Sequence, residues 1–462
     1  MSVTTIHPLY AEFAPIVKLT RDAVKGNPAI KAAGVTYLPA DFSESDPDRY
    51  IVYKGRAYFV GFTGQTQAAT IGMVFRKPAV VELSPQLEAL TDNIDGSGQS
   101  LDQVGKYAVK EVEEAGRLCF LADYPSAEEG LTKSREAELG LRAYMSTYTF
   151  ESFINWKTET IGGRDTLTLV VLKESVEDPK NTDEFSHELK DQYRVLRLVD
   201  GVYTQQLYDD ANTPIGEQWT PLQAGRKLDH IPFYIAGALN NLPNPDMPTL
   251  YDIAVVNVSH YTNTADLEES SFMMSQPHIH MNIGTDTDID NYNTLNPNGL
   301  VYGARSGSIT MGGSMDLLQA NENNLAAKLM LEKEDRMKAL GARMVQDGGQ
   351  AETAEAARIN ASAQTSTLST VVLNVGDAMS QCLVDMALFM KAGDKASYTL
   401  NQDFWEASLN PQLVTAITGL KSIGTIATTD VLYMLRNGKI GLDPDRTDKM
   451  IMEDSANELI DG

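Results

Sequence analysis

The spacing in this sequence that most resembles a metal site is His278-x-His280. Residues two apart on a β-strand share a face, so both imidazoles could reach one ion. No third His or Cys lies near them, although Asp286 and Asp288 follow. A polar turn segment that contains two histidines by chance explains the pattern better, and we expect neither a metal nor another cofactor.

The acidic run that begins at Asp286 has the alternation of a calcium-binding loop. Such a loop needs Gly at its sixth position and a bidentate Glu at its twelfth. The chain has Asn291 and Pro297 at those positions. We therefore interpret the run as three acids in a solvated turn.

Motifs for phosphate binding or nucleophilic catalysis are missing from the sequence. The Gly-Lys pairs at 105–106 and 438–439 lack the hydroxyl residue and the upstream Gly of a phosphate loop. No Gly-x-Ser-x-Gly elbow occurs, and His187, His230 and His260 stand in unlike contexts. We predict that the chain is not an enzyme and has no catalytic residues. The alternative is a metal-dependent hydrolase built on the histidine pair and nearby acids, which metal analysis with a His280→Ala variant would reveal.

One charged segment departs from the balance of the chain. Residues 322–343 carry four acids and five bases, a net charge of +1 in a protein whose net charge is −25. A solvated helical face with pairs such as Glu332–Arg336 and Glu334–Lys338 would explain it, at tenths of a kcal/mol per pair. A functional basic face is the other interpretation. Its bases are Lys328, Lys333, Arg336, Lys338 and Arg343.

The elements that would position these residues change along the chain. Three- and four-residue apolar spacing predicts helices over most of the first 160 residues, such as Pro8–Val24 and Leu101–Ala115. From Thr166, short β-branched and aromatic runs separated by turn residues predict an antiparallel β region up to about residue 240.

Three long helices are predicted in the second half. The first begins near Thr249 and is ended by Pro277. Residues 278–313 predict a compact β insertion, and a helix resumes near Met315. Its apolar face holds Leu318, Leu325, Leu329, Met337 and Leu340. A Gly-rich break at 346–350 precedes a helix over 353–390. Two long helices around a small insertion would project as a stalk, and neighbouring copies in a ring would cover it.

Composition excludes some partners. With 63 acidic and 38 basic residues, the chain lacks the clustered bases that grip DNA or anionic lipid. Cys119 and Cys382 fit no metal spacing, and we expect both to be reduced. No uninterrupted apolar run of about 18 residues and no signal pattern is seen, so we expect a soluble, intracellular protein without membrane contact.

The sequence resembles the portal proteins of tailed bacteriophages, in a subgroup catalogued as a phage domain of unknown function. The likeness covers nearly the whole chain, and the order and spacing of several segments carry it. They are His7–Tyr10, Arg21–Gly26, Gly34–Pro39, Lys54–Ala57, Gly72–Pro78, Asp92–Gly96, Leu118–Pro125, Ile231–Phe233, and Thr353–Ala356 leading to Ser366–Leu368.

The resemblance implies a mostly helical α+β portal fold with a wing, long stem helices, a small α/β clip, a tunnel loop and a short helical crown. By position along the chain, the segments are a wing at 1–248 (helical to about 160, β-rich at about 161–240), stem helices at 249–275 and 315–344, the clip at 276–314, the tunnel loop at 345–352, a long wing helix at 353–402 and the crown at 403–462.

The resemblance also implies a function and partners. Portals form a ring, usually of twelve subunits, at one capsid vertex of the virion, and they assemble in the host cytoplasm. The expected partners are the terminase large subunit, head-completion or adaptor proteins, the major capsid and scaffolding proteins, and double-stranded DNA that passes without tight binding. Another ring-forming virion component, such as an adaptor, or a shell protein is the alternative.

Particular residues acquire expected roles from this likeness. The tunnel loop would face the channel, the stem bases would face the channel or a neighbouring subunit, and His278, His280, Asp286 and Asp288 would lie in the clip. The tunnel-loop residues are Gln346, Asp347, Gly348, Gly349 and Gln350. An acidic wall would let DNA slide, because it repels phosphate.

Overall fold

The computed structural model describes residues 2–125, 141–178, 185, 187–223, 225–274, 278–282, 286–295, 297, 314–318, 325–341 and 354–402, with single residues beyond them. The chain divides into two compact units, Met1–Asn401 and Gln402–Gly462. Of the second unit only Gln402, Phe404, Gly419, Thr429, Val431, Leu432, Thr447, Lys449 and Met450 are described. The helices and strands with defined bounds all belong to the first unit.

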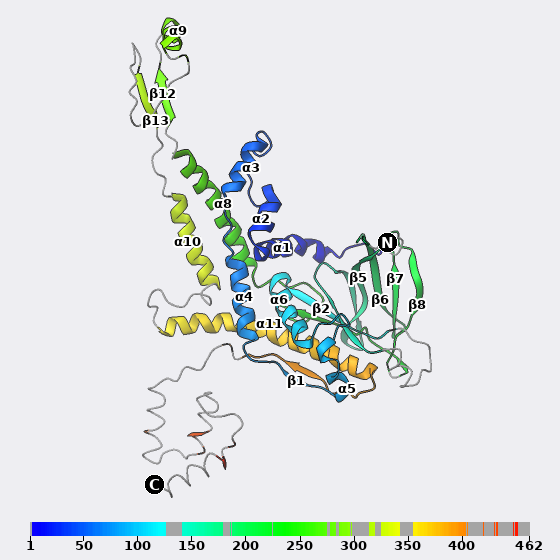
Figure 1. Ribbon diagram of the computed structural model, residues 1–462. Helices are drawn as coiled ribbons and strands as arrows, with labels where there is room; N and C mark the ends of the chain where they lie inside the picture. The colour runs from blue at the N-terminus through cyan, green and yellow to red at the C-terminus, as the bar shows by residue number, and fades with distance from the viewer. Residues whose placement is uncertain are drawn as a thin grey trace. The chain divides into compact units, whose positions relative to one another are not determined.

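Short helices with local caps make up the N-terminal part of this unit (Figure 1). The Nδ1 atom of His7 caps the first helix, and Asp46 caps the third by accepting from the Arg49 N–H. Ser100 and Gln103 form a capping box, and Gly116 ends that helix in the left-handed conformation. The helices are α1 (Pro8–Lys25), α2 (Asn27–Ala33), α3 (Pro47–Arg56), α4 (Phe62–Val74), α5 (Pro85–Glu88) and α6 (Leu101–Ala115), with 3₁₀ turns at Gly34–Thr36 and Thr91–Asn93.

Two antiparallel sheets follow α6. The smaller has the order β11-β2-β3, and the larger has the order β4-β5-β6-β7-β8. The strands are β2 (Arg117–Asp123), β3 (Tyr144–Tyr148), β4 (Phe153–Ile161), β5 (Arg164–Glu177), β6 (Leu189–Val199), β7 (Val202–Tyr208), β8 (Pro214–Trp219) and β11 (Phe233–Gly237). The short pairs are β1 (Val80–Glu82) with β14 (Ser397–Thr399), and β9 (Leu222–Gln223) with β10 (Arg226–Lys227).

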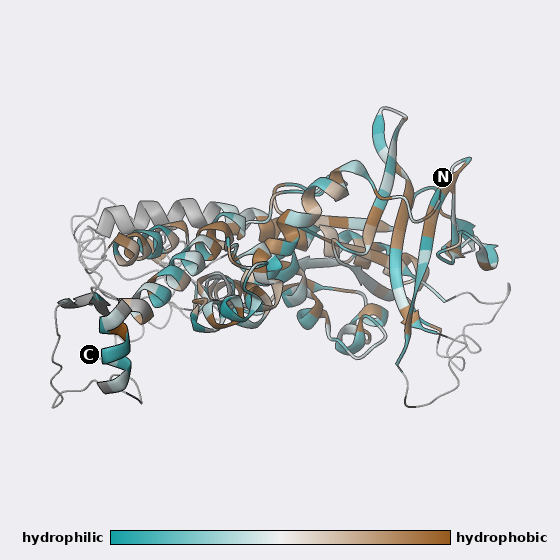
Figure 2. Cartoon of the chain, turned by 90° about the horizontal axis from the view of Figure 1, so that it is seen from above, coloured by the Kyte–Doolittle hydropathy of each residue, from teal (hydrophilic) through white to brown (hydrophobic). Residues whose placement is uncertain are grey.

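The 36-residue helix α11 (Ala354–Phe389) packs on β2, β11, β14 and α6. Its stretch Thr367–Phe389 is the one place in the described helices long and apolar enough, by length and composition, to cross a membrane, and most of it is buried in the protein. Asn374 and Asp377 interrupt this stretch, so a search for an unbroken apolar run does not find it. Figure 2 shows apolar and polar residues interleaved along the helices and strands, as expected of elements with one buried face.

The described part of the segment between β11 and α11 contains three helices and one pair of strands. Helix α8 (Tyr251–Met274) is followed by β12 (His278–Asn282), α9 (Asp286–Leu295), β13 (Ser314–Leu318) and α10 (Leu325–Leu340). Strands β12 and β13 pair antiparallel, with His280 opposite Asp316. Helices α8 and α10 pack against each other.

The structure corrects two boundaries expected from the sequence. The helical part ends at Ala115 rather than near 160, because β2, β3 and β4 already form sheets. The helix expected from Met315 begins at Leu325 instead, and Leu318 lies in β13 opposite His278. Both differences arise because strand pairing joins residues far apart in the sequence, and the local spacing of apolar residues does not reveal such pairing. The predicted helices over Leu101–Ala115 and 353–390 are confirmed.

Candidate assembly site

Helix α8 is covered by different elements on two opposite faces (Figure 1). Ala254, Tyr261 and Ala265 are buried in a cluster with residues of α1, α2 and α3. Ser259 and Asn263 contact α10 instead. Residues two apart on a helix point to roughly opposite sides, so Tyr261 and Ala265 lie opposite Ser259 and Asn263. Helix α8 therefore lies between α10 and the helices α1 to α3 at this level, whereas nearer the start of α8, Val24 of α1 and Phe62 of α4 pack on the cluster that contains Met337 of α10.

Lys333 joins α10 to α8. Its Nζ donates to the Ser259 carbonyl oxygen at 2.9 Å, to Ser259 Oγ at 2.8 Å and to Asn263 Oδ1. Burial lowers the pKa of this ammonium group. Nearer the end of the helix, Met337 is fully buried with Leu250 and Ile253. Higher numbers on α10 meet lower numbers on α8, so the two helices run antiparallel.

A buried imidazole lies in the same seam. His260 of α8 is 1% exposed, and its Nε2 lies 3.5 Å from Glu334 Oε1 on α10. This separation is longer than a normal hydrogen bond. Burial lowers the pKa of His260, which favours the neutral form at neutral pH. The seam thus contains polar groups that hold α8 and α10 in one register.

Helix α10 leaves both leucines and charged side chains exposed. Leu329 is 37% exposed and Leu340 is 40% exposed, whereas Met337 is buried. The pairs expected between Glu332 and Arg336 and between Glu334 and Lys338 do not form. Lys338 lies 3.3 Å from Asp335, and Glu334 faces His260. Of the five bases expected on this helix, Lys333 is thus used inside the subunit, while Lys328 and Arg336 are exposed.

The opposite flank of α8 is held by α3. The Tyr53 hydroxyl donates to Asp266 Oδ1 at 2.7 Å, and Arg56 pairs with Glu269. The outward side of α3 carries Ile51, 61% exposed, and Val52, 49% exposed. These two residues were not predicted as site residues from the sequence. The sequence did contain a signal for this exposed side. Tyr50 and Tyr53 are spaced to share one buried face of a helix, which leaves the two residues between them on the other side.

The other expected site residues lie apart from this seam. The tunnel loop Gln346–Gln350 and Arg343 lie outside the described residues. His278 and His280 occupy β12 positions two apart, on one face of the strand, and Asp286 and Asp288 open α9. Leu325, expected to pack in the stem, is 62% exposed. Those of these residues that the structure describes are not gathered into one site.

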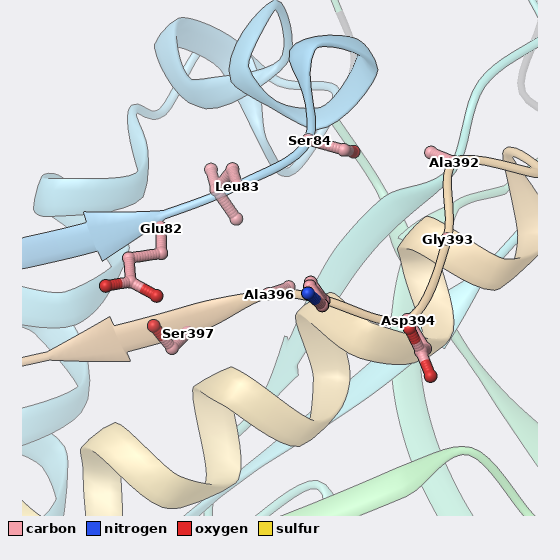
Figure 3. A pocket seen from close by; sticks show the side chains of 9 residues that line it. Glu82, Leu83, Ser84, Ala392, Gly393, Asp394, Ala396 and Ser397 are labelled. Atoms are coloured by element: carbon pink, nitrogen blue, oxygen red, sulfur yellow. The ribbon is translucent and has the colours of Figure 1, made fainter.

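The described residues contain no group of three His, Cys, Asp or Glu side chains placed to hold a metal ion. A surface hollow of about 650 Å³ lies between the segment after β1 and the segment before β14 (Figure 3). Glu82, Ser84, Asp394 and Ser397 line it; the Glu82 carboxylate lies beside Ser397, its partner across the strand pair, whereas Ser84 and Asp394 lie apart from them.

A smaller cavity of about 140 Å³ lies where α4, α6, α8, α10 and α11 meet, and Leu340 of α10 lines it. The Glu113 carboxyl lines it, and the Thr70 hydroxyl donates to that group at 2.9 Å. Burial raises the pKa of Glu113 to about 8, so this acid is mostly protonated at neutral pH. A neutral, hydrogen-bonded acid without a neighbouring base fits a structural role in the core.

A comparison with known protein families finds a match for the α8–α11 region. Residues 249–390 match a family described as a domain of unknown function, DUF4055. This range spans α8, β12, α9, β13, α10 and α11. No curated protein sequence matches the chain.

The structure also matches solved structures over most of the chain. A chain of the native gene transfer agent virion has 11% identity and a TM-score of 0.37, covering 83% of this chain and 91% of that one. A chain of the neck of the empty gene transfer agent particle has 11% identity and a TM-score of 0.38, covering 86% and 94%. An HK97 family phage portal protein from Corynebacterium diphtheriae has 10% identity and a TM-score of 0.31, covering 74% and 92%.

Proposed function

We propose that this chain is a portal subunit that forms a ring around a central DNA channel and connects a viral head to its tail. One observation carries the proposal. Antiparallel helices α8 and α10 enclose, in chain order, a segment in which the described residues form two strands and one helix. This is the stem–clip–stem order of a portal. The polar seam between α8 and α10 fixes the pair as a unit, and α10 still has exposed leucines.

The sequence resemblance to portal proteins supports the same function. The matching solved structures come from gene transfer agent particles and a phage portal protein, and their names agree with it. Because the TM-scores lie below 0.5, the proposal is based on the chain's own features. In this proposal residues 1–248 and 353–402 are the wing, 276–314 the clip, 345–352 the tunnel loop and 403–462 the crown.

The charge of the chain fits a channel through which DNA moves. A net charge of −25 per subunit opposes tight phosphate binding. The proposed partners are the terminase large subunit during packaging, then head-completion or adaptor proteins, with the major capsid and scaffolding proteins around the ring. Its place is the portal vertex of the virion.

Negative-stain microscopy of the purified full-length protein tests the proposed function. We expect discrete rings with a central hole, because the exposed face of α10 needs a lateral partner and a closed ring supplies one for every subunit. Filaments, closed shells or a monomer at all concentrations would contradict the proposal.

Deletion of Asp347–Gln350 tests the proposed tunnel loop. We expect the variant to form rings of normal size, since the stem contacts are untouched, but to lower the amount of packaged DNA. The measurement is DNA per particle in a packaging assay, with rings counted by microscopy as the control. Normal packaging by the variant would show that this loop does not act in the channel.

A further inference from the structure

Strand β1 is paired along one edge only, within the described part of the chain. Its partner is β14, and Val81 lies directly opposite Tyr398 in this pair. Figure 3 shows the two strands side by side. All three residues of β1 are exposed, Val80 to 64% and Val81 to 38%. The edge of β1 that faces away from β14 is therefore accessible to another strand.

The contact of β14 with α11 shows which main-chain groups of β1 point to this free edge. The Tyr398 N–H donates to Ser380 Oγ of α11 at 2.9 Å, and the same Oγ lies 3.3 Å from the Tyr398 carbonyl oxygen. The polar main-chain groups of Tyr398 are thus directed to α11. Residues opposite each other in an antiparallel pair either exchange both hydrogen bonds or direct all their groups outward. The N–H and C=O of Val81 therefore point away from β14, and neither has a partner among the described residues.

A surface groove of about 580 Å³ lies beside the free edge. The consecutive residues Val81, Glu82 and Leu83 line one side of it, and α5, the 3₁₀ turn Thr91–Asn93 and the start of α6 line the other. Side chains of consecutive strand residues point to opposite faces, so a hollow lined by all three lies at the edge of the strand. No residue of β14 lines it. The groove is thus placed where a third strand would lie.

The lining of the groove is acidic. Four of its nine lining residues carry carboxylates, and none carries a basic side chain. The acids are Glu82, Glu88, Asp92 and Asp102, and all four are exposed. None of them forms an ion pair within the described part of the chain. The groove therefore has uncompensated negative charge.

The bases nearest to the groove do not neutralise it. Arg142 donates to the Asn93 carbonyl oxygen at 2.7 Å, and Lys106 lies one turn after Asp102 on α6. Lys395 lines the hollow on the β14 side of β1. None of the three bases lies within ion-pair distance of the lining acids.

These charges decide which occupant fits the free edge. Two copies of this chain would bring the same acids together if their β1 edges met, and like charges across an interface are unfavourable. DNA and anionic lipid carry the same sign of charge as the groove. A segment with lysine or arginine side chains has the complementary charge.

We propose that the free edge of β1 binds an extended, lysine- or arginine-bearing segment of another protein, which adds as a third strand beside β1. The N–H and C=O of Val81 pair with the main chain of this segment, and its basic side chains meet the acids of the groove. The contact covers about four residues, or about 13 Å of extended chain. This inference goes beyond the proposed function, because it names a contact with a different protein that does not depend on ring formation.

Binding of a synthetic peptide to the full-length protein tests the inference. The probe is the end-blocked, fluorescently labelled peptide Ser-Lys-Val-Lys-Val-Lys-Ser, and fluorescence anisotropy at low salt is the measurement. We expect saturable binding that weakens as salt is added, because the contact pairs opposite charges at an exposed site. The same peptide with glutamate in place of lysine should not bind.

Methylation of the peptide main chain separates strand addition from attraction by charge. Two further peptides carry N-methyl groups either on the lysines or on the valines, and both retain every charge. Alternate residues of a strand direct their N–H groups to the same edge, so one of the two peptides has lost the edge that pairs with β1. We expect that peptide to bind about tenfold more weakly. Equal binding of all the basic peptides would overturn the inference.

Two variants of the protein test the two parts of the contact. Val81→Pro removes the N–H at the free edge without removing a hydrogen bond to β14, and proline is tolerated at such edge positions. We expect binding to weaken about fivefold. The double variant Glu82→Gln/Glu88→Gln retains the edge but removes two charges, and we expect a loss of about three- to tenfold at low salt.

The matched control is Glu12→Gln/Glu217→Gln, which removes the same net charge at two exposed residues of α1 and β8. We expect it to bind the peptide as wild type does. Failure of the lysine peptide to bind wild type, or wild-type affinity in Glu82→Gln/Glu88→Gln or in a Val81→Pro protein shown to be folded by circular dichroism, would overturn the inference. These outcomes leave the proposed function intact, because rings are observed separately by microscopy.

Discussion

Replacement of Arg21 by methionine is expected to lower the free energy of unfolding by about 3–5 kcal/mol. The guanidinium donates five hydrogen bonds, which is its full number of N–H groups. Two go to Glu111 at 2.6 and 3.1 Å, two to Glu151 at 2.6 and 3.0 Å, and one to Glu114 at 3.2 Å. The side chains of Glu111 and Glu114 are only 6% and 5% exposed. Methionine would leave these buried carboxylates without their shared cation.

The loss should shrink as the pH falls. Burial raises the pKa of Glu151, but Arg21 outweighs this and lowers it below the ordinary 4.5. A carboxyl with a lowered pKa stabilises the fold above pH 4.5, and this contribution is lost as the pH falls through the lowered value. In acid the wild-type protein therefore loses the stabilisation that Arg21 provides, and the variant lacks this stabilisation at every pH. The free energies of unfolding of the two proteins should therefore converge as the pH falls.

Urea denaturation at matched protein concentration measures this effect. The control is Lys18→Met, which removes the 2.5 Å pair between Lys18 and Asp22 on the same helix. Lys18 is 64% exposed, so this change should cost less than about 1 kcal/mol. Equal losses in the two variants would show that burial of the carboxylates does not set the energy of this cluster.

The elements with strong local signals could be predicted from the sequence. Helix α6 has Ser100 and Gln103 as a capping box before it and Gly116 after it, so its bounds follow from local chemistry. Helix α11 has a long apolar repeat, and its length was predicted correctly. The strands β5 to β7 alternate with turn residues at regular intervals.

Elements fixed by distant partners could not be predicted in this way. Leu118–Ala122 in β2 is a short apolar run that fits either a buried strand or a buried helix, and only pairing with β3 and β11 decides. Ser314–Leu318 forms a strand because it pairs with β12. The cluster around Arg21 joins residues 90 and 130 positions apart, which no local spacing reveals.

The α10 surface shows why a predicted apolar face can be wrong in part. Leu325, Leu329 and Met337 were expected to lie on one face. Twelve residues separate Leu325 from Met337, which is about a third of a turn out of register. The structure accordingly buries Met337 against α8 and leaves Leu325 and Leu329 exposed. The charged helix could be identified from the sequence. The contact of Lys333 with α8 could not, because it depends on where α8 lies in the fold.

A buried aspartate on α11 should make the stability of the fold depend on pH. Asp385 is 3% exposed and accepts hydrogen bonds from three residues of other elements. Its partners are His230 Nε2 at 3.0 Å, the Tyr234 hydroxyl at 2.5 Å and Gln223 Nε2 at 3.1 Å. The hydrogen bond to Asp385, joined by Asp229, raises the pKa of His230 to about 9 although burial opposes it. His230 is thus an imidazolium at neutral pH that ties its loop to α11.

The sign of the pH dependence follows from this raised pKa. A histidine with a folded pKa above its ordinary 6.5 stabilises the fold fully below pH 6.5, and the stabilisation is lost as the pH rises toward 9. The His230 side chain is 39% exposed, so solvent reduces the effect to about 1–2 kcal/mol over this window. We expect wild type to lose this stability between pH 6.5 and 9, as measured by urea denaturation.

Asp385→Asn should remove most of that pH dependence and lower the free energy of unfolding by about 2–4 kcal/mol at pH 6.5. The imidazolium loses its buried counter-charge, and the amide cannot accept from Tyr234, Gln223 and His230 as a carboxylate does. The matched control is His187→Gln, because His187 also lies near a glutamate, at 3.7 Å from Glu177, but is 79% exposed. That variant should retain the wild-type pH profile, since an exposed pair contributes little. An Asp385→Asn profile as steep as that of wild type between pH 6.5 and 9 would show that another group titrates there, and that the contact of His230 with α11 does not depend on its charge.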